Sequence, residues 1–300
     1  MSTSPGGTWI SNWWRRSVDV DLKIHLGDPQ YPILLSRTPV PPERLNLRGR
    51  ILRSDALAVA IVGSRSPTPY GRYMARLIAG DLAASGVTVI SGLARGIDAQ
   101  AHEAALEKGG RTLAVLGCGL DIDYPRGSGD LRKRIIASGA LISEYDPGTP
   151  PLPGNFPSRN RIISGLSLGV VVVQAAERSG SLITARWALD QGREVMAVPG
   201  RADDPLSAGP IALLRDGAAP ACGADDVLRS IGLEDMAKPT KDTGTRGHGP
   251  VVEALGPGPR LPEDLARATG LTLPRVLSEL SKLELEGLVV RDEGGQFSLK

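Results

Sequence analysis

The sequence predicts a doubly wound α/β domain with a Rossmann-like parallel sheet, followed by a smaller winged-helix domain. Short runs of β-branched and other apolar residues predict strands, and helix-like stretches separate most of them. Strands buried on both faces read as continuous apolar runs, and strand–helix alternation implies right-handed crossovers in a parallel sheet. The predicted strands are 59–63, 87–92, 112–117, 140–144, 170–175 and 194–200.

The stretches between these strands predict helices that cover the sheet. Apolar side chains recur there with helical spacing, and each stretch ends in glycine, which supplies a left-handed cap. These stretches are 70–86, 97–110 and 182–192. The larger domain is therefore predicted over 59–230.

Three further segments flank this domain. Residues 1–58 carry prolines that interrupt every apolar run, so we expect an irregular, extended lead-in that packs on the core. Residues 231–249 are polar without an apolar period, which predicts a linker. Residues 250–300 contain three short helical patterns and a hairpin turn at Gly294-Gly295, which is the order of a winged helix. One apolar stripe of its third helix is predicted to contain Val276, Leu277, Leu280 and Leu283.

The bulk composition limits the classes of function. The chain of 300 residues carries 35 Lys and Arg against 33 Asp and Glu, a net charge of +2, so any phosphate site must be local. The two cysteines form no C-x-x-C motif, which favours a reducing cytoplasm and excludes a zinc framework. We expect no membrane segment and no signal peptide, because no apolar run approaches the roughly 20 residues of a membrane helix.

Turns that combine glycine and arginine follow two neighbouring predicted strands. Gly63, Ser64 and Arg65 follow the first, and Gly92 with Arg95 follows the second. Ligands of open parallel sheets bind outside the carboxyl ends of the strands, where glycine lets the backbone approach an anion and arginine binds phosphate. Each turn alone also fits a purely structural role, but the pair favours a phosphate site.

Two arginines and a phenylalanine cluster at another predicted helix start. Arg159 and Arg161 flank Asn160 where cations oppose the helix dipole, a placement that an anion bound nearby would explain. Phe156 offers a platform on which a base can stack. The structural alternative is that Phe156 only fills a gap beside prolines.

A hydroxyl-rich loop opens the helix that follows the fifth predicted strand. Ser179, Gly180, Ser181 and Thr184 fit an anion cradle, and serine is equally an ordinary N-cap residue.

The sequence contains no motif for catalysis, a metal or a cofactor. Asp98 and His102 share one helix face, but no third partner is spaced to suit acid–base chemistry, so capping or core packing is the preferred interpretation. The dinucleotide fingerprint, the P-loop and the nucleophile elbow are absent, as is any cluster with metal-ligand spacing. We therefore expect no catalytic residues, no metal and no cofactor.

Taken in order, these motifs resemble the DNA-processing protein A (DprA/Smf) family. The resemblance extends over about 28–228, and the predicted winged helix also resembles that of the family. The segments that carry it are VAIVGSRSPTPYG, SGLARGIDAQAH, AVLGCGLDIDYP, SEY, FPSRNRIISGLS, SGSLITA and AVPG. The family strand that usually ends in Glu ends here in Gln174, and Ile211 stands in a loop that usually carries Asn. We expect the change at Ile211 to affect affinity rather than the fold.

This resemblance implies a DNA-binding function. The family binds single-stranded DNA, dimerises through the Rossmann-like domain, loads RecA recombinase in natural transformation (competence) and DNA recombination, and is not known as an enzyme. The implied DNA pocket contains Gly63, Ser64, Arg65, Gly92, Arg95, Phe156, Arg159, Asn160 and Arg161, bordered by Ser179, Gly180, Ser181 and Thr184.

Two other functions stay open. A nucleotide phosphoribohydrolase resembling the LOG enzymes would bind a nucleoside monophosphate in this pocket, although the Pro-Gly-Gly-x-Gly-Thr-x-x-Glu signature is missing at 177–182. A winged-helix regulator would need a basic recognition helix, whereas 250–300 carries six basic and eight acidic residues. We expect this domain to contact protein rather than duplex DNA.

Overall fold

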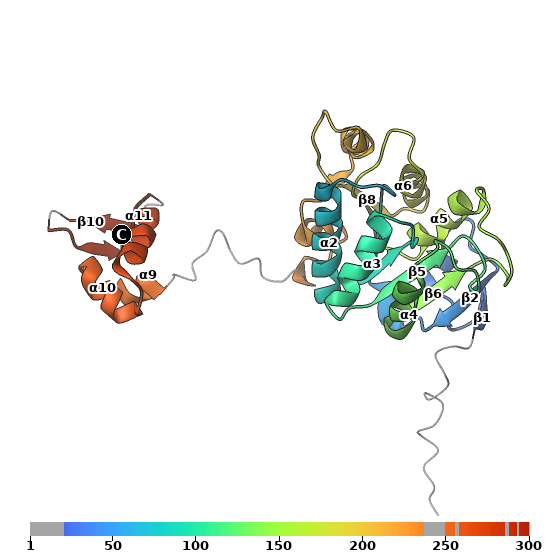
Figure 1. Ribbon diagram of the computed structural model, residues 1–300, viewed down its shortest axis with the longest axis horizontal. Coiled ribbons are helices and arrows are strands. Elements are labelled where there is room, and N and C mark those ends of the chain that lie inside the picture. The colour runs from blue at the N-terminus through green and yellow to red at the C-terminus, as the bar shows by residue number, and fades with distance from the viewer. Residues whose placement is uncertain (1–20, 237–249, 256–257, 286–287, 293, 300) are drawn as a thin grey trace, which may run out of the picture. The chain divides into compact units, whose positions relative to one another are not determined.

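The computed structural model describes residues 21–236, 250–255, 258–285, 288–292 and 294–299 (Figure 1). Contacts divide the chain into two compact units, 1–238 and 239–300. The predicted linker lies mostly outside the described residues, as do the first 20 residues of the predicted lead-in.

A nine-stranded, mostly parallel sheet forms the centre of the larger unit, with the order β1-β2-β6-β5-β4-β3-β7-β8-β9. All six strands predicted from the sequence are present, and the last two end earlier than predicted. The strands are β1 (Leu22–His25), β2 (Arg44–Gly49), β3 (Ala58–Val62), β4 (Thr88–Ser91), β5 (Thr112–Leu116), β6 (Ala140–Ser143), β7 (Gly169–Val172), β8 (Glu194–Ala197) and β9 (Ala219–Pro220).

Residues 21–58 contribute to the core, but the prediction that this lead-in is irregular is wrong, because two of its segments form strands. β1 and β2 add two antiparallel strands to the edge of the sheet at β6, with Leu47 opposite Ile142. β1 is a short edge strand that buries only Ile24, and β2 alternates polar residues with Leu45 and Leu47, so neither has the continuous apolar run of a central strand.

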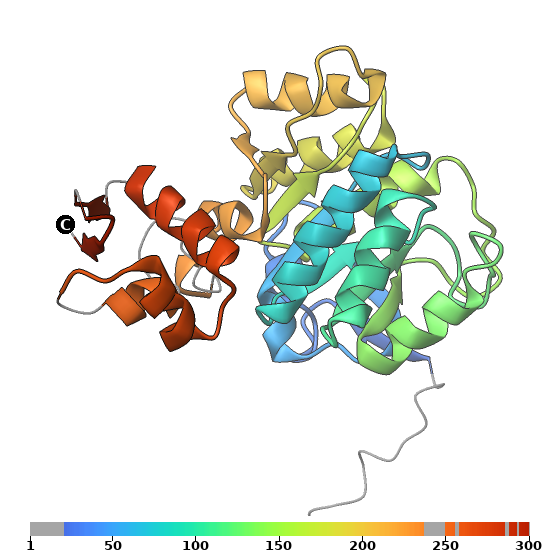
Figure 2. The ribbon, with the colours of Figure 1, turned by 60° about the vertical axis from the view of Figure 1, so that its left-hand side comes forward.

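Helices cover both faces of the sheet. One face carries α2 (Pro69–Ala84), α3 (Ile97–Glu107), α4 (Gly129–Ser138) and α8 (Ala224–Ser230), of which α2 and α3 lie side by side in Figure 2. The other face carries α1 (Ile33–Ser36), α5 (Asn155–Gly165), α6 (Gly180–Asp190) and α7 (Ala208–Arg215).

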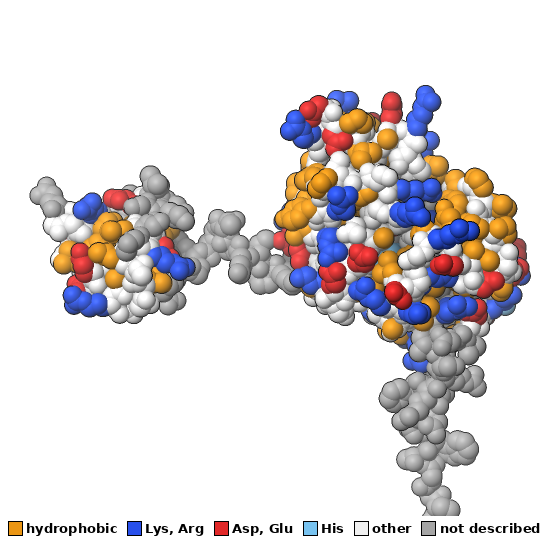
Figure 3. Space-filling view, viewed as in Figure 1, with side chains coloured by type: hydrophobic (Ala, Val, Ile, Leu, Met, Phe, Trp, Pro, Cys, Tyr) orange, Lys and Arg blue, Asp and Glu red, His pale blue; other side chains and the backbone are white. Residues whose placement is uncertain are grey.

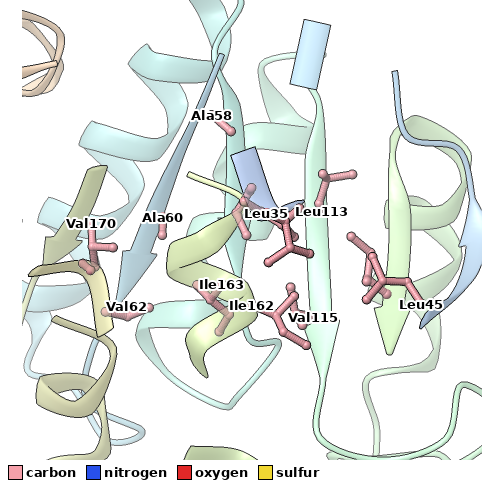
Figure 4. Packing of buried hydrophobic residues seen from close by; sticks show 14 of the residues in the cluster. Leu35, Leu45, Ala58, Ala60, Val62, Leu113, Val115, Ile162, Ile163 and Val170 are labelled. Atoms are coloured by element: carbon pink, nitrogen blue, oxygen red, sulfur yellow. The ribbon is translucent and has the colours of Figure 1, made fainter. Parts of the chain in front are cut away.

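Strand side chains alternate between the two hydrophobic cores. In β3, Ala60 and Val62 face α5, whereas Val59 and Ile61 face α2 and α3. Figure 4 shows the core on the α5 side of the sheet, in which Ile162 and Ile163 lie against side chains of the strands. Within the described part of the chain, no helix is long and apolar enough to cross a membrane.

The smaller unit has the predicted order of a winged helix. Helices α9 (Pro250–Leu255), α10 (Pro262–Thr269) and α11 (Leu273–Leu285) precede a hairpin of β10 (Val289–Arg291) and β11 (Phe297–Leu299).

The predicted apolar stripe on α11 is wrong at one position. Val276 and Leu280 are buried, whereas Leu277 is 43% exposed. Residue 277 follows 276 by about 100° around the helix, so both side chains cannot face the same small core.

Candidate functional site

The candidate site lies at the carboxyl ends of the parallel strands, where the strand order reverses. From β3 the chain moves outward through β4, β5 and β6, and α5 then returns it to β7 on the other side of β3. In doubly wound sheets, ligands bind in the crevice at such a switch point. Two adjoining hollows open there, and they share Arg65, Ala94, Tyr124, Phe156 and Arg159.

The first hollow, of about 360 Å³, has three arginines on its rim. Arg65, Arg95 and Arg126 are exposed, and none of them forms an ion pair with any residue that the structure describes. Figure 3 shows basic, acidic and apolar side chains intermixed over one face of the larger unit, in keeping with its low net charge. The unpaired arginines therefore form a local basic site.

The second hollow, of about 420 Å³, is lined by the start of α6 and by α5. Ser179 caps α6: its Oγ accepts from the Ser181 backbone N–H at 3.3 Å and lies 2.7 Å from Ser181 Oγ. Asn160 Nδ2 donates to Gly180 O at 3.1 Å and so ties α5 to this loop. Thr184 also lines the hollow but is 1% exposed.

Close backbone packing joins the loops that carry Arg65 and Arg95. A methyl group at Gly63 would lie 2.7 Å from Ile97 Cγ1, and one at Gly96 would lie 2.4 Å from Ser64 O. Gly96 also has a φ of +84°, which favours glycine. The Ser64 N–H donates to Gln174 O at 2.7 Å. Ser64 therefore fixes the turn, and its side chain lines neither hollow.

Aromatic rings form a wall shared by the hollows. The ring centroids of Phe156 and Tyr124 are 5.4 Å apart, and Arg65 Cζ lies 5.6 Å from the Phe156 centroid. A methyl group at Gly117 would lie 2.9 Å from Phe156 Cδ1, so this glycine is needed to seat the ring. A ring that also packs beside an unpaired cation suits both stacking and charge recognition.

Arg159 lines both hollows, but its side chain is only 4% exposed. Its Nη1 donates to Gly92 O at 2.9 Å and also to Val115 O. Burial lowers the pKa of Arg159 to about 10, an effect that the nearby Asp98 carboxylate opposes. Burial raises the pKa of Asp98, which Arg159 and the backbone N–H groups of Ala94 and Gly92 oppose.

The structure does not bring Arg161 into either hollow. Its Nη2 pairs with Glu144 Oε1 at 2.5 Å, and its backbone O accepts from Gln191 Nε2 at 2.9 Å. The placement of two arginines near the start of α5 is thus explained by carbonyl partners for Arg159 and by a carboxylate for Arg161. A bound anion is not needed to explain either one.

Asp98 and His102 do not form an acid–base pair open to solvent. Asp98 Oδ2 accepts from the N–H of Gly92 at 3.1 Å and of Ala94 at 3.4 Å. His102 is fully buried, with Nδ1 2.6 Å from Thr112 Oγ1. Burial, with a contribution from Arg159, lowers the pKa of His102 to about 3, so the ring is neutral. Both residues thus act in capping and packing.

The lining residues that the sequence did not predict include an aromatic ring and an arginine. Tyr124 and Arg126 lie in the segment after β5, in which no helix follows the strand directly. The only signal for them was the cluster of polar and turn residues in DIDYPRG, which by itself predicts a loop.

Comparison with known proteins identifies the class first: a mostly parallel α/β domain of the recombination-mediator type, joined to a winged helix. The family model described as "DNA recombination-mediator protein A" matches residues 23–232, and that of the "DprA winged helix domain" matches 235–295. This chain belongs to the DNA recombination-mediator protein A (DprA/Smf) family.

Individual relatives agree with this assignment. The chain is 41% identical to Protein Smf of Escherichia coli over 90% of this chain and 75% of that protein. It is 43% identical to the DNA processing protein DprA of Bacillus subtilis over 69% and 70%. The structure of DprA from Streptococcus pneumoniae matches with a TM-score of 0.66 and 41% identity, over 70% of this chain and 74% of that one.

A second solved structure is matched over nearly the whole length of its own chain. It concerns the "unique single-stranded DNA binding mode" of DNA processing protein A from Helicobacter pylori. The match has a TM-score of 0.64 and 30% identity, over 72% of this chain and 97% of that one.

Proposed function

We propose that this protein binds single-stranded DNA at the two hollows. The observation that carries the proposal is the set of three exposed arginines without acidic partners, Arg65, Arg95 and Arg126, beside the rings of Phe156 and Tyr124. Arginines that follow a phosphate backbone, combined with rings that stack on bases, bind single strands with little dependence on sequence. The single-stranded DNA binding of the Helicobacter pylori relative supports the same ligand class.

Single strands are preferred because the rings need an unpaired base. In a duplex the bases are stacked inside, and only the phosphates reach the arginines. We expect Gly63 and the Ser179–Ser181 loop, which line the second hollow, to border the path of the strand.

The test is a fluorescence anisotropy titration with a labelled oligonucleotide, single-stranded or duplex, at several salt concentrations. We expect Arg65→Ala to weaken single-strand binding strongly while the protein stays folded. Arg53→Ala is a matched control, because Arg53 is an exposed arginine of the 3-10 turn (Arg53–Ala56) that precedes β3. This turn lies at the amino end of the strand, whereas the hollows lie at the carboxyl ends. Equal affinities of the two variants would contradict the proposal.

The proposal includes no catalytic step. Asp98 and His102 are engaged by backbone N–H groups and by Thr112, respectively. The test against a LOG-like hydrolase is incubation with nucleoside monophosphates followed by chromatography. Release of free base would contradict a purely binding role.

We propose, further, that the protein acts as a homodimer in the cytoplasm and loads RecA recombinase onto DNA in transformation and recombination. The family description as a recombination mediator supports this role. A second copy would lengthen a track that has few arginines in one chain and would add avidity. RecA assembly on single strands, followed by light scattering with and without this protein, tests the loading; an unchanged rate would contradict it.

For the winged helix we propose a protein partner. Leu273 and Leu277 are 36% and 43% exposed on α11, one turn apart, and 250–300 has an acidic balance. An exposed apolar pair on an acidic unit is poorly suited to the phosphates of duplex DNA.

A further inference from the structure

Arg159 is largely buried, and backbone carbonyls engage one end of its charged group. The residue is 4% exposed, its Nε is buried without a hydrogen-bond partner, and its Nη1 donates to Gly92 O and Val115 O. These carbonyls lie at the ends of β4 and β5. The Nη1 of Arg159 is therefore engaged by the backbone at both strand ends.

Gly92 is held from two sides. Its O accepts from Arg159 Nη1 at 2.9 Å, and its N–H donates to Asp98 Oδ2 at 3.1 Å. A methyl group at this position would lie 2.7 Å from Arg159 Nη2 and 2.8 Å from Cζ. The guanidinium therefore packs directly against the backbone of residue 92, and only glycine allows this contact.

The loop that starts at Gly92 has an unfavourable backbone conformation. In this β4–α3 loop, Gly92–Gly96, the non-glycine residue Leu93 has a φ of +55°, and Leu93 is 1% exposed. Such conformations persist only where surrounding contacts enforce them. Arg159 and Asp98 supply such contacts at the start of the loop.

The same loop supports both of the glycine–arginine turns. It carries Arg95, and its end packs on the other turn, where the Ile97 N–H donates to Ser64 O at 3.1 Å. A methyl group at Gly96 would lie 2.7 Å from Arg65 C and O. A shift of the β4–α3 loop would therefore move Arg95 directly and Arg65 through its backbone.

We propose that Arg159 is a positioning residue that holds the β4–α3 loop through Gly92, and so places Arg65 and Arg95 for DNA, without contacting DNA itself. This inference rests on the proposed function. It predicts that the effect of Arg159 depends on the presence of the two exposed arginines, because residues that act through shared partners are not additive.

The test is a double-mutant cycle on the full chain with a single-stranded oligothymidine at low salt. Arg159→Lys keeps the positive charge but loses the planar group that packs on Gly92. We expect it to lower affinity about tenfold in the wild type and less than about twofold in the Arg65→Ala/Arg95→Ala background. A direct phosphate contact predicts little loss with lysine, or an equal loss in both backgrounds, and either result would overturn the inference.

Gly92→Ala tests the same contact without changing any charge. We expect it to reproduce the loss of Arg159→Lys and the same dependence on background, and wild-type affinity would overturn the inference. Thermal unfolding checks that each variant is folded. If both variants fail to fold, Asp98→Asn replaces them, since it weakens the hold on Gly92 and Ala94 while keeping the side-chain shape; unchanged affinity would then overturn the inference.

Failure of the proposed function is read from a separate arm. If Arg65→Ala/Arg95→Ala binds the oligonucleotide as well as the wild type does, the site itself is wrong, whatever Arg159 does. If that variant binds weakly and the cycle with Arg159→Lys is additive, only the positioning role is wrong.

Discussion

At the scale of single residues, the partner of each arginine determines its role more than its place in a motif. Arg65, Arg95 and Arg159 all belong to segments that predicted a phosphate site, yet Arg159 is buried and donates from Nη1 to two backbone carbonyls, whereas Arg65 and Arg95 are exposed. Arg126, which no motif marked, shares the hollow with them. Sequence spacing shows where a side chain starts, but only the fold shows what it contacts.

The Phe156 ring provides a residue-scale prediction. Phe156→Leu keeps apolar packing against Gly117 but removes the stacking face, so we expect single-strand binding to weaken by about 1–3 kcal/mol. Tyr73→Leu is the control, because Tyr73 is 61% exposed on α2 and lines neither hollow. Isothermal titration with a short oligonucleotide measures both, and similar affinities for the two variants would count against stacking.

Gln174 replaces the Glu that the family resemblance leads one to expect, and its surroundings explain why an amide suits the position. Its Nε2 donates to Thr68 Oγ1 at 2.9 Å and to Asp204 Oδ2 at 3.2 Å, and its Oε1 accepts from the Thr68 N–H at 3.0 Å. A carboxylate here would face the Asp204 carboxylate, with no proton to donate.

Gln174→Glu is therefore expected to lower the free energy of unfolding at pH 7 by about 1–3 kcal/mol. The neighbouring carboxylate raises the folded-state pKa of the introduced acid, so the loss is present above its unfolded pKa and shrinks as pH falls and the acid protonates. Urea unfolding at pH 7 and pH 5 measures this. Adding Asp204→Asn should restore stability at pH 7, and no recovery would contradict the explanation.

At the scale of elements, an ion pair stabilises the amino ends of the central strands, opposite the site. Asp55 of the 3-10 turn accepts from Arg111 Nε at 2.8 Å, and from Thr88 Oγ1 at the same distance. Arg111, just before β5, also donates to Ser138 O at 2.6 Å. Asp55 is 5% exposed, so one carboxylate joins the starts of β3, β4 and β5.

Asp55→Asn is expected to destabilise the larger unit by about 2–3 kcal/mol, because Arg111 loses a charged partner on a largely buried carboxylate. Single-strand affinity should not change, because the pair lies at the amino ends of the strands and both hollows lie at the carboxyl ends. Asp203→Asn, which breaks the exposed Arg201–Asp203 pair, is expected to leave stability unchanged. Chemical denaturation with binding measured in parallel checks both, and equal stability of the two variants would refute the role of Asp55.

The sequence predicts the central elements well and the edge elements poorly, for physical reasons. β3 to β8 are buried on both faces and leave continuous apolar runs, whereas β1 is a short edge strand, β2 carries polar residues between its leucines, and prolines lie between the two. Glycines at strand ends marked the turns of Arg65 and Arg95. No sequence pattern predicts the burial of Arg159, because it depends on how α5 packs against the ends of β4 and β5.

At the scale of the whole molecule, we expect the larger unit to bind DNA and the smaller unit to contact protein. The larger unit holds both hollows, and the smaller unit presents exposed leucines on α11. We expect an isolated 248–300 fragment, shown to be folded by circular dichroism, to have no measurable affinity for duplex DNA. Binding of duplex by the folded fragment in a mobility-shift assay would contradict this division.

The central claim is that a few unpaired arginines at strand ends, rather than overall charge, bind the DNA backbone. The most direct test is the slope of log affinity against log salt for a single strand. Removing one phosphate contact should reduce the magnitude of this slope by about 0.7 in Arg65→Ala and leave it unchanged in Arg53→Ala. An unchanged slope in Arg65→Ala, or an equal reduction in both variants, would contradict the claim.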